Sequence, residues 1–262
     1  MPLVVEALWL GVPILASIWA IKLWRLSLIR RYPILFTYLA LVAPLQFGGY
    51  FLYSSGLTVW DQKAYNLFWV VITPLYWAFW FGVTFEVYGH MLEKYAGVRK
   101  LGKIVLYGGL GAVALAVAIL IYSDPYQIPD LNRWKSLWLK QEQAVLLAIA
   151  ALVFVLLVFK RTFGLTVPKN VQLVFATFGL YFAGVAALMV VRTYLGPGFR
   201  PFRDLMSLVL DAMCLAVGAA LFSRAGEAET ASPVNDLRPA MAARAAEQLQ
   251  SFNDRLVRVL NT

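Results

Sequence analysis

The sequence is poor in the residues that build metal centres, disulfides and charged surfaces. Cys214 is the only cysteine, which excludes an intrachain disulfide and a CxxC metal framework. His90 is the only histidine, so a three-histidine zinc site and a bis-histidine haem site within one chain are excluded. Charged residues make up 14% of the chain, against about 25% in soluble domains. We therefore expect no metal, no cofactor and no soluble globular fold.

Hydrophobic residues are abundant instead, at 61% of the chain, and they form long runs. A helix needs about 20 apolar residues to cross the hydrocarbon core of a bilayer. Seven stretches qualify, at residues 3–23, 34–54, 67–90, 104–122, 141–159, 171–192 and 205–222. The runs are continuous rather than alternating, which argues against a membrane barrel. The sequence therefore predicts an all-α polytopic membrane protein, with residues 1–224 forming a seven-transmembrane-helix bundle.

The distribution of basic residues predicts the orientation of this bundle. Sixteen of the 23 Lys and Arg residues follow the first, third, fifth and seventh predicted spans. Because cytoplasmic segments carry the excess of Lys and Arg, the N-terminus is expected outside and the C-terminus in the cytoplasm. The net charge of +9 is interpreted as a topology signal and as contact with anionic lipid in the bilayer, not as nucleic-acid binding.

The segment after the last span has two parts. Residues 225–240 are small, polar and proline-containing, which predicts a flexible linker. Residues 241–262 are predicted to form a cytoplasmic amphipathic helix. Its apolar positions follow a heptad spacing, at Ala242, Ala245, Leu249, Phe252, Leu256 and Val259. This helix either packs on its own bundle or the membrane surface, or uses 241–260 to form a homo-oligomer or bind a cytoplasmic protein partner.

Ionisable residues inside a span are rare and suggest function. In the seventh span Asp204, Ser207, Asp211 and Cys214 lie at spacings of three and four, which places them on one helix face. Arg192 ends the sixth span on the same side and is expected to reach Asp211 or Asp204. The stripe is either an interhelical ion pair that fixes packing or a ligand or ion site that opens outward.

A candidate pocket lies among the first three spans and the seventh. Pro13, Pro44 and Pro74 fall inside the first three spans, where a proline removes a backbone donor and favours a kink. Polar and aromatic residues near these prolines are typical of small-molecule sites. The candidate ligand-binding residues are Gln46, Tyr76, Trp77, Trp80, Arg192, Ser207 and Asp211.

Glu86 and His90 lie four residues apart at the end of the third span, so their side chains share a helix face. A carboxylate beside an imidazole favours the charged form of the histidine. The two residues are either a proton-responsive pair or a capping pair in the headgroup region. They do not make a metal site by themselves, because the chain has no second histidine.

Short runs in the sequence carry a family resemblance. They are Phe85-Glu86-Val87-Tyr88-Gly89-His90, then Leu101-Gly102-Lys103, and Phe178-Gly179-Leu180 in the sixth span. With these runs the chain resembles a group of uncharacterised seven-helix bacterial inner-membrane proteins, which similarly end their third span with Glu and His before a basic loop. The resemblance covers most of residues 1–225. It implies a seven-helix bundle in a bacterial inner membrane and no mechanism, because the group has no established activity.

Three classes of function remain. A microbial rhodopsin is rejected, because the seventh span has no lysine for a retinal Schiff base. An enzyme is disfavoured, because a histidine set for zinc and a GxSxG motif are absent from the sequence. The leading hypothesis is a non-enzymatic, receptor-like or sensory module with a pocket in the outer half. The alternatives are a structural subunit of a larger membrane complex and a small transporter or channel subunit.

Overall fold

The computed structural model describes residues 3–54, 59–93, 95, 131–163, 167–227, 229–230 and most of 247–258. The chain divides into two compact units. The first comprises Met1–Val87 and Val167–Thr230, and the second comprises Tyr88–Thr166 and Ala231–Thr262. The candidate site lies entirely within the first unit.

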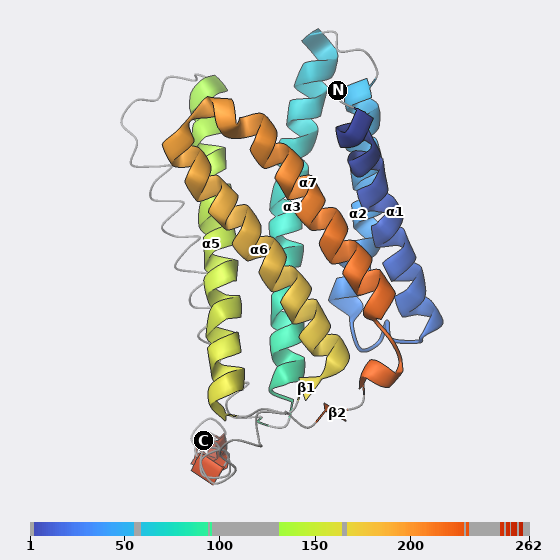
Figure 1. Cartoon of the computed structure of the whole chain (residues 1–262), viewed down its shortest axis with the longest axis vertical. Coiled ribbons are helices and arrows are strands. Elements are labelled where there is room, and N and C mark those ends of the chain that lie inside the picture. The colour runs from blue at the N-terminus through green and yellow to red at the C-terminus, as the bar shows by residue number, and fades with distance from the viewer. Residues whose placement is uncertain are drawn as a thin grey trace. The chain divides into compact units, whose positions relative to one another are not determined.

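The first unit is built from long apolar helices (Figure 1). They are α1 (Leu3–Arg25), α2 (Pro33–Ser54), α3 (Val59–Met91), α6 (Lys169–Leu195) and α7 (Arg200–Leu221). Each is long and apolar enough to cross a membrane. They coincide with five of the seven predicted spans, and the helices continue through Pro13, Pro44 and Pro74. The predicted span 104–122 lies outside the described residues.

Helix α7 packs between α6 and α1 (Figure 1). At the end of α1, the Lys22 ammonium donates hydrogen bonds to the carbonyl oxygens of Ala219 and Ala220, over 2.6 and 2.8 Å. These carbonyls belong to the last turn of α7, which lacks partners within its own helix and carries the negative end of the helix dipole. Lys22 therefore stabilises the end of α7 and holds α1 and α7 parallel.

Helices α2 and α6 run opposite to α1, α3 and α7 (Figure 1). The start of α1 meets the end of α2, where the Tyr50 hydroxyl donates a hydrogen bond of 2.6 Å to Glu6 Oε1. The end of α3 meets the start of α2 through Glu86, described below. We call the two ends of this unit the Glu6 end, where α1, α3 and α7 begin, and the Glu227 end, where they finish.

Helices α1 and α7 approach closely at Gly218. This glycine is buried, and a Cβ atom there would lie 2.7 Å from Trp19 Cε3 and closer still to two other atoms of the indole ring. Trp19 is only 1% exposed and its other contacts include the ring of Phe222. The position requires glycine because only a residue without a side chain lets the indole rest on the helix backbone.

The chain after α7 differs from the predicted flexible linker at its start. Residues Ala225–Glu227 form the short helix η2, and Glu229–Thr230 form strand β2. Strand β2 pairs antiparallel with β1 (Val167–Pro168), which directly precedes α6. The small, polar composition of this stretch suits close contact with the helix ends as well as it suits a linker. Residues 231–240 lie outside the described part.

The second unit contains α5 (Leu131–Phe163). The predicted fifth span, 141–159, falls inside this helix, and the apolar stretch Ala144–Val158 is shorter than the five candidate spans. In the predicted tail helix, the residues that the structure describes between 247 and 258 are helical. The side chains of Leu249, Phe252 and Leu256 lie outside the described residues, so the amphipathic character of this helix stays a prediction.

Candidate functional site

A cluster of polar and aromatic side chains lies inside the first unit at about the middle of its helices. It comprises Tyr38 and Gln46 of α2, Tyr76 and Trp80 of α3, and Asp211 of α7, and we call it the Asp211 cluster. Asp211 interacts electrostatically with Tyr38 and Tyr76. Four of the predicted ligand-binding residues are therefore brought together, and Tyr38, which is not among the predicted residues, joins them.

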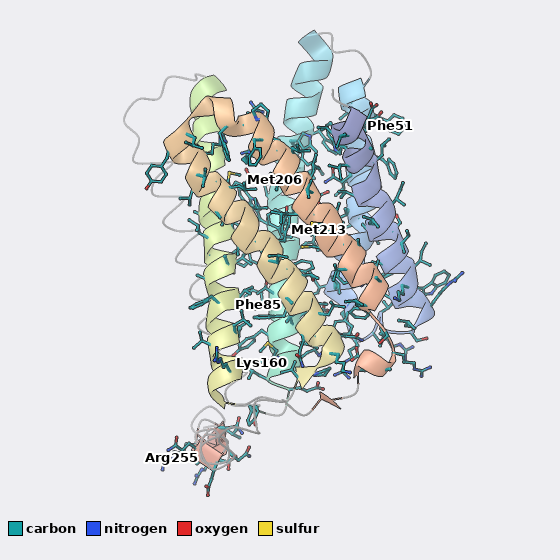
Figure 2. All side chains as sticks on the ribbon, viewed as in Figure 1. Phe51, Phe85, Lys160, Met206, Met213 and Arg255 are labelled. Atoms are coloured by element: carbon teal, nitrogen blue, oxygen red, sulfur yellow. The ribbon has the colours of Figure 1, made fainter. Side chains whose placement is uncertain are left out.

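Asp211 lies on the interior face of α7. Leu215 and Gly218, four and seven residues further on, share this face and are buried. Met213, labelled in Figure 2, lies on the opposite side of the helix and is 54% exposed. Asp211 itself is only partly buried. It makes no hydrogen bond or ion pair with any residue that the structure describes.

The other members of the cluster hold one another in place. Trp80 Nε1 donates a hydrogen bond of 3.3 Å to the hydroxyl oxygen of Tyr38. Trp9 Nε1 donates one of 3.1 Å to Gln46 Oε1. The Tyr76 hydroxyl lies beside the Gln46 amide, but it is buried and makes no hydrogen bond of good geometry with a described residue. Donor capacity is thus left over next to the Asp211 carboxyl group.

Aromatic rings surround these polar groups. The ring of Tyr76 lies 6.3 Å from that of Tyr38 and 6.2 Å from that of Trp80, between ring centroids. The cluster continues into α6, where the Phe178 ring lies 5.9 Å from Tyr38 and the Phe182 ring 5.5 Å from Trp80. Rings at these separations attract one another and form a rigid, mostly apolar wall.

The remaining candidates of the outer stripe lie elsewhere. Ser207 donates its hydroxyl to the Arg203 carbonyl oxygen of its own helix, over 2.8 Å. Asp204, which with Asp211 is one of the two expected partners of Arg192, forms ion pairs with Arg203 and Arg200 of its own helix. The reason is local: an arginine four residues before an aspartate lies on the same helix face. Arg192 is in the last turn of α6, and the indole nitrogen of Trp77 is buried in α3.

Glu86 caps a neighbouring helix. Its two carboxylate oxygens accept hydrogen bonds from the backbone N–H groups of Ile34 and Leu35, each over 3.0 Å. The first N–H groups of a helix lack partners in the helix and favour a negative charge. His90, the other member of the predicted pair, has Nδ1 4.0 Å from Glu93 Oε2. The carboxylate of Glu86 thus has a structural task at the start of α2.

A second polar cluster lies at the Glu227 end, and no local pattern in the sequence predicts it. The Glu227 carboxylate forms an ion pair of 2.7 Å with Arg31 Nε and accepts hydrogen bonds from the Tyr32 hydroxyl, over 3.1 Å, and from Asn170 Nδ2. Asn170 is 1% exposed and also donates to the carbonyl oxygen of Ser223. We call these residues the Glu227 cluster. It ties the start of the tail to the starts of α2 and α6.

This second cluster predicts a loss of stability in alkali. Burial, and then the nearby Glu227 carboxylate, raise the pKa of Tyr32 above its ordinary value of 10.0. The unfolded chain therefore releases the Tyr32 proton above about pH 10, while the folded chain retains it, so stability falls as the pH rises further. We expect the alkaline decrease in melting temperature to be smaller in Tyr32→Phe than in the wild type. An equal decrease in both proteins would contradict this assignment.

The groups of the Asp211 cluster are suited to binding a small molecule. It supplies one carboxyl group, one amide and two phenol hydroxyls within an aromatic wall, a pattern typical of small-molecule sites. Among the described residues, no three His, Cys, Asp or Glu side chains gather closely enough to hold a metal ion. Comparisons with protein-family models, curated proteins and solved structures give no match. The arrangement of the residues is therefore the basis for a functional assignment.

Proposed function

We propose that this chain is a non-enzymatic, receptor-like membrane protein that binds a small ligand at the Asp211 cluster. One observation carries the proposal: a carboxyl group in the middle of an apolar helix bundle lacks a partner among the described residues. Moving a carboxylate out of water is unfavourable by several kcal/mol or more unless it is paired, and a polar residue held there without a partner indicates a functional role.

A topology of seven spans supports this function. Glu86 and Asn170 lie at the same end of the first unit, since each contacts a group at the Glu227 end. The chain therefore leaves this unit after Val87 and returns to it at Val167 at the same end, which is compatible with an even number of further spans. The predicted spans 104–122 and 141–159 supply two crossings. We place the basic residues of the Glu227 end in the cytoplasm and the N-terminus outside. The resemblance to bacterial inner-membrane proteins favours that membrane for this chain.

Binding is favoured over transport by the polar groups between Asp211 and the Glu227 end. The Thr84 hydroxyl donates to the Trp80 carbonyl oxygen and the Cys214 thiol to that of Thr177, over 2.8 and 3.1 Å. The Glu86 carboxylate accepts hydrogen bonds from backbone N–H groups at the start of α2. These groups are satisfied by the bundle itself and offer no free ligands to a passing solute. In the Asp211 cluster itself, in contrast, the Asp211 carboxyl group and the Tyr76 hydroxyl make no hydrogen bond of good geometry with a described residue.

The Glu227 cluster offers a route by which ligand binding could change the position of the tail. It joins the starts of α2 and α6 to the chain that follows α7, so a shift of α7 caused by a ligand would move the start of the tail. The tail helix would then bind a cytoplasmic protein or a second copy of this chain. The alternative of a structural subunit needs the same helix contacts but no ligand, which makes the two readings separable by experiment.

Native mass spectrometry of the full-length protein, extracted gently from membranes, tests the proposal. We expect the wild type to retain a defined small molecule, and Asp211→Asn to lose it while folding with an unchanged melting temperature. Asp204→Asn is the matched control, because Asp204 lies on the same helix and pairs with arginines. A less stable Asp211→Asn variant, together with a wild type that carries foreign subunits and no small molecule, would show a structural role instead.

A further inference from the structure

The Asp211 cluster also indicates the class of ligand, an inference that rests on the proposed function. We propose that the ligand is a small organic cation, an amine or a quaternary ammonium ion, whose charge is held by Asp211 and by the faces of the surrounding rings. Three observations lead to this class: the missing counterion of Asp211, the free capacity of Tyr76 and the nature of the wall.

The protein offers Asp211 no cation of its own among the described residues. Arg200 and Arg203, the arginines of α7, form ion pairs with Asp204. Asp204 precedes Asp211 by seven residues, which is about 10 Å along the helix. Lys22 is used at the far end of α7, where it donates to two backbone carbonyl groups. A carboxylate in an apolar setting is strongly stabilised by an opposite charge. A cationic ligand supplies that charge from outside the protein.

Tyr76 provides an independent sign of a ligand. Its side chain is 8% exposed, and its hydroxyl group makes no hydrogen bond of good geometry with a described residue, although it lies beside Gln46 and close to Asp211. A buried hydroxyl whose hydrogen has no acceptor is unfavourable by about 1–3 kcal/mol. A ligand placed between Tyr76 and Asp211 would satisfy the hydroxyl and the carboxyl group together.

The composition of the wall favours an organic cation over a metal ion. The rings of Tyr38, Tyr76 and Trp80 pack against one another, Tyr38 and Tyr76 interact electrostatically with Asp211, and the negative face of an aromatic ring attracts an ammonium group. Calcium instead requires six to eight oxygen ligands and magnesium a full octahedron, commonly completed by water. The cluster offers one carboxyl group, the Gln46 amide and two phenol oxygens in mostly apolar surroundings. The chemistry therefore suits a weakly hydrated organic cation.

The test is equilibrium binding to the full-length protein in lipid nanodiscs, measured by isothermal titration calorimetry. The cationic probes are tetramethylammonium, choline and phenethylamine. The uncharged control is 2-phenylethanol, which has nearly the shape of phenethylamine, and sodium and calcium chloride test inorganic ions. We expect saturable binding of at least one organic cation. Its affinity should fall at least about tenfold in Asp211→Asn, less in Tyr76→Phe, and stay within about twofold in Asp204→Asn.

Several outcomes would overturn the inference and still separate it from the proposed function. Equal binding of 2-phenylethanol and phenethylamine that depends on Asp211 would show a ligand site without preference for charge. Binding of sodium or calcium alone would show an inorganic ion site. Organic-cation binding that survives Asp211→Asn would place the cation elsewhere. If none of the probes binds, the inference is overturned. If, in addition, native mass spectrometry finds no retained small molecule, the proposed function is overturned as well.

Discussion

Replacing Gly218 with Ala is expected to destabilise the protein by about 2 kcal/mol, although alanine is the better helix former. In an unconstrained helix, Gly→Ala gains about 0.5–1 kcal/mol. At Gly218 the new methyl group would overlap the Trp19 ring, which is buried and packed against Phe222. Overpacking a tight core site costs about 1–3 kcal/mol, and the rigid indole ring here cannot swing aside as a flexible chain would. Thermal unfolding in nanodiscs measures the effect.

Gly11→Ala is the matched control. Gly11 lies in α1, and a Cβ atom there would meet nothing within 4 Å. This variant should be as stable as the wild type or slightly more so. A second variant tests the cause: in a protein that already carries Trp19→Leu, the Gly218→Ala change should lose most of its effect. A full effect in that background would assign the cost to something other than the contact with Trp19.

Replacing Glu227 with Ala is expected to lower the free energy of unfolding by about 3 kcal/mol and to free the chain after α7. The change leaves Tyr32 and Asn170, both fully or almost fully buried, without the acceptor that they share. Each buried donor left without a partner costs about 1–3 kcal/mol. The ion pair with Arg31 adds less, because the Arg31 side chain is 36% exposed and solvent weakens the attraction.

Two measurements check this second prediction. Thermal unfolding gives the loss of stability, and hydrogen exchange at Glu229 and Thr230 reports whether the β1–β2 pair opens. Glu227→Gln should keep much of the stability, since its amide oxygen still accepts hydrogen bonds. Glu6→Ala is the matched control, because the exposed Glu6 carboxylate accepts a hydrogen bond from Tyr50. A loss of similar size in both alanine variants would refute a special role for Glu227.

The long helices could be predicted from the sequence because the apolar runs have the length that a bilayer demands. The chain after α7 could not. Glu227 stands in a stretch of small and polar residues whose composition is that of a linker, and its partner Tyr32 lies 195 residues earlier in the chain. Contacts over such separations leave no periodicity in the local sequence. The requirement for glycine at position 218 could not be predicted either, because a glycine among alanines is common in membrane helices.

The candidate site could be predicted in part. Asp211 and Gln46 stand out because polar residues are rare inside apolar runs, and Tyr76 and Trp80 closely follow Pro74 within the third span. Tyr38 could not be predicted as a site residue, because a tyrosine close to the end of a predicted span is typical of the membrane–water interface. The ion pair of Asp204 with Arg200 could have been predicted as well, because the spacing of four residues is visible in the sequence.

The bond between Lys22 and the end of α7 has a consequence for biosynthesis. Its partners are 197 and 198 residues apart in the chain. At about 5–20 residues per second, a ribosome needs roughly 10–40 s to make the chain that separates them. During that interval α1 is already in the membrane while the surface that receives Trp19 and Lys22 does not yet exist. Helix α1 therefore stays without this partner until α7 has been made, and a factor that shields α1 from premature association would raise the yield of folded protein.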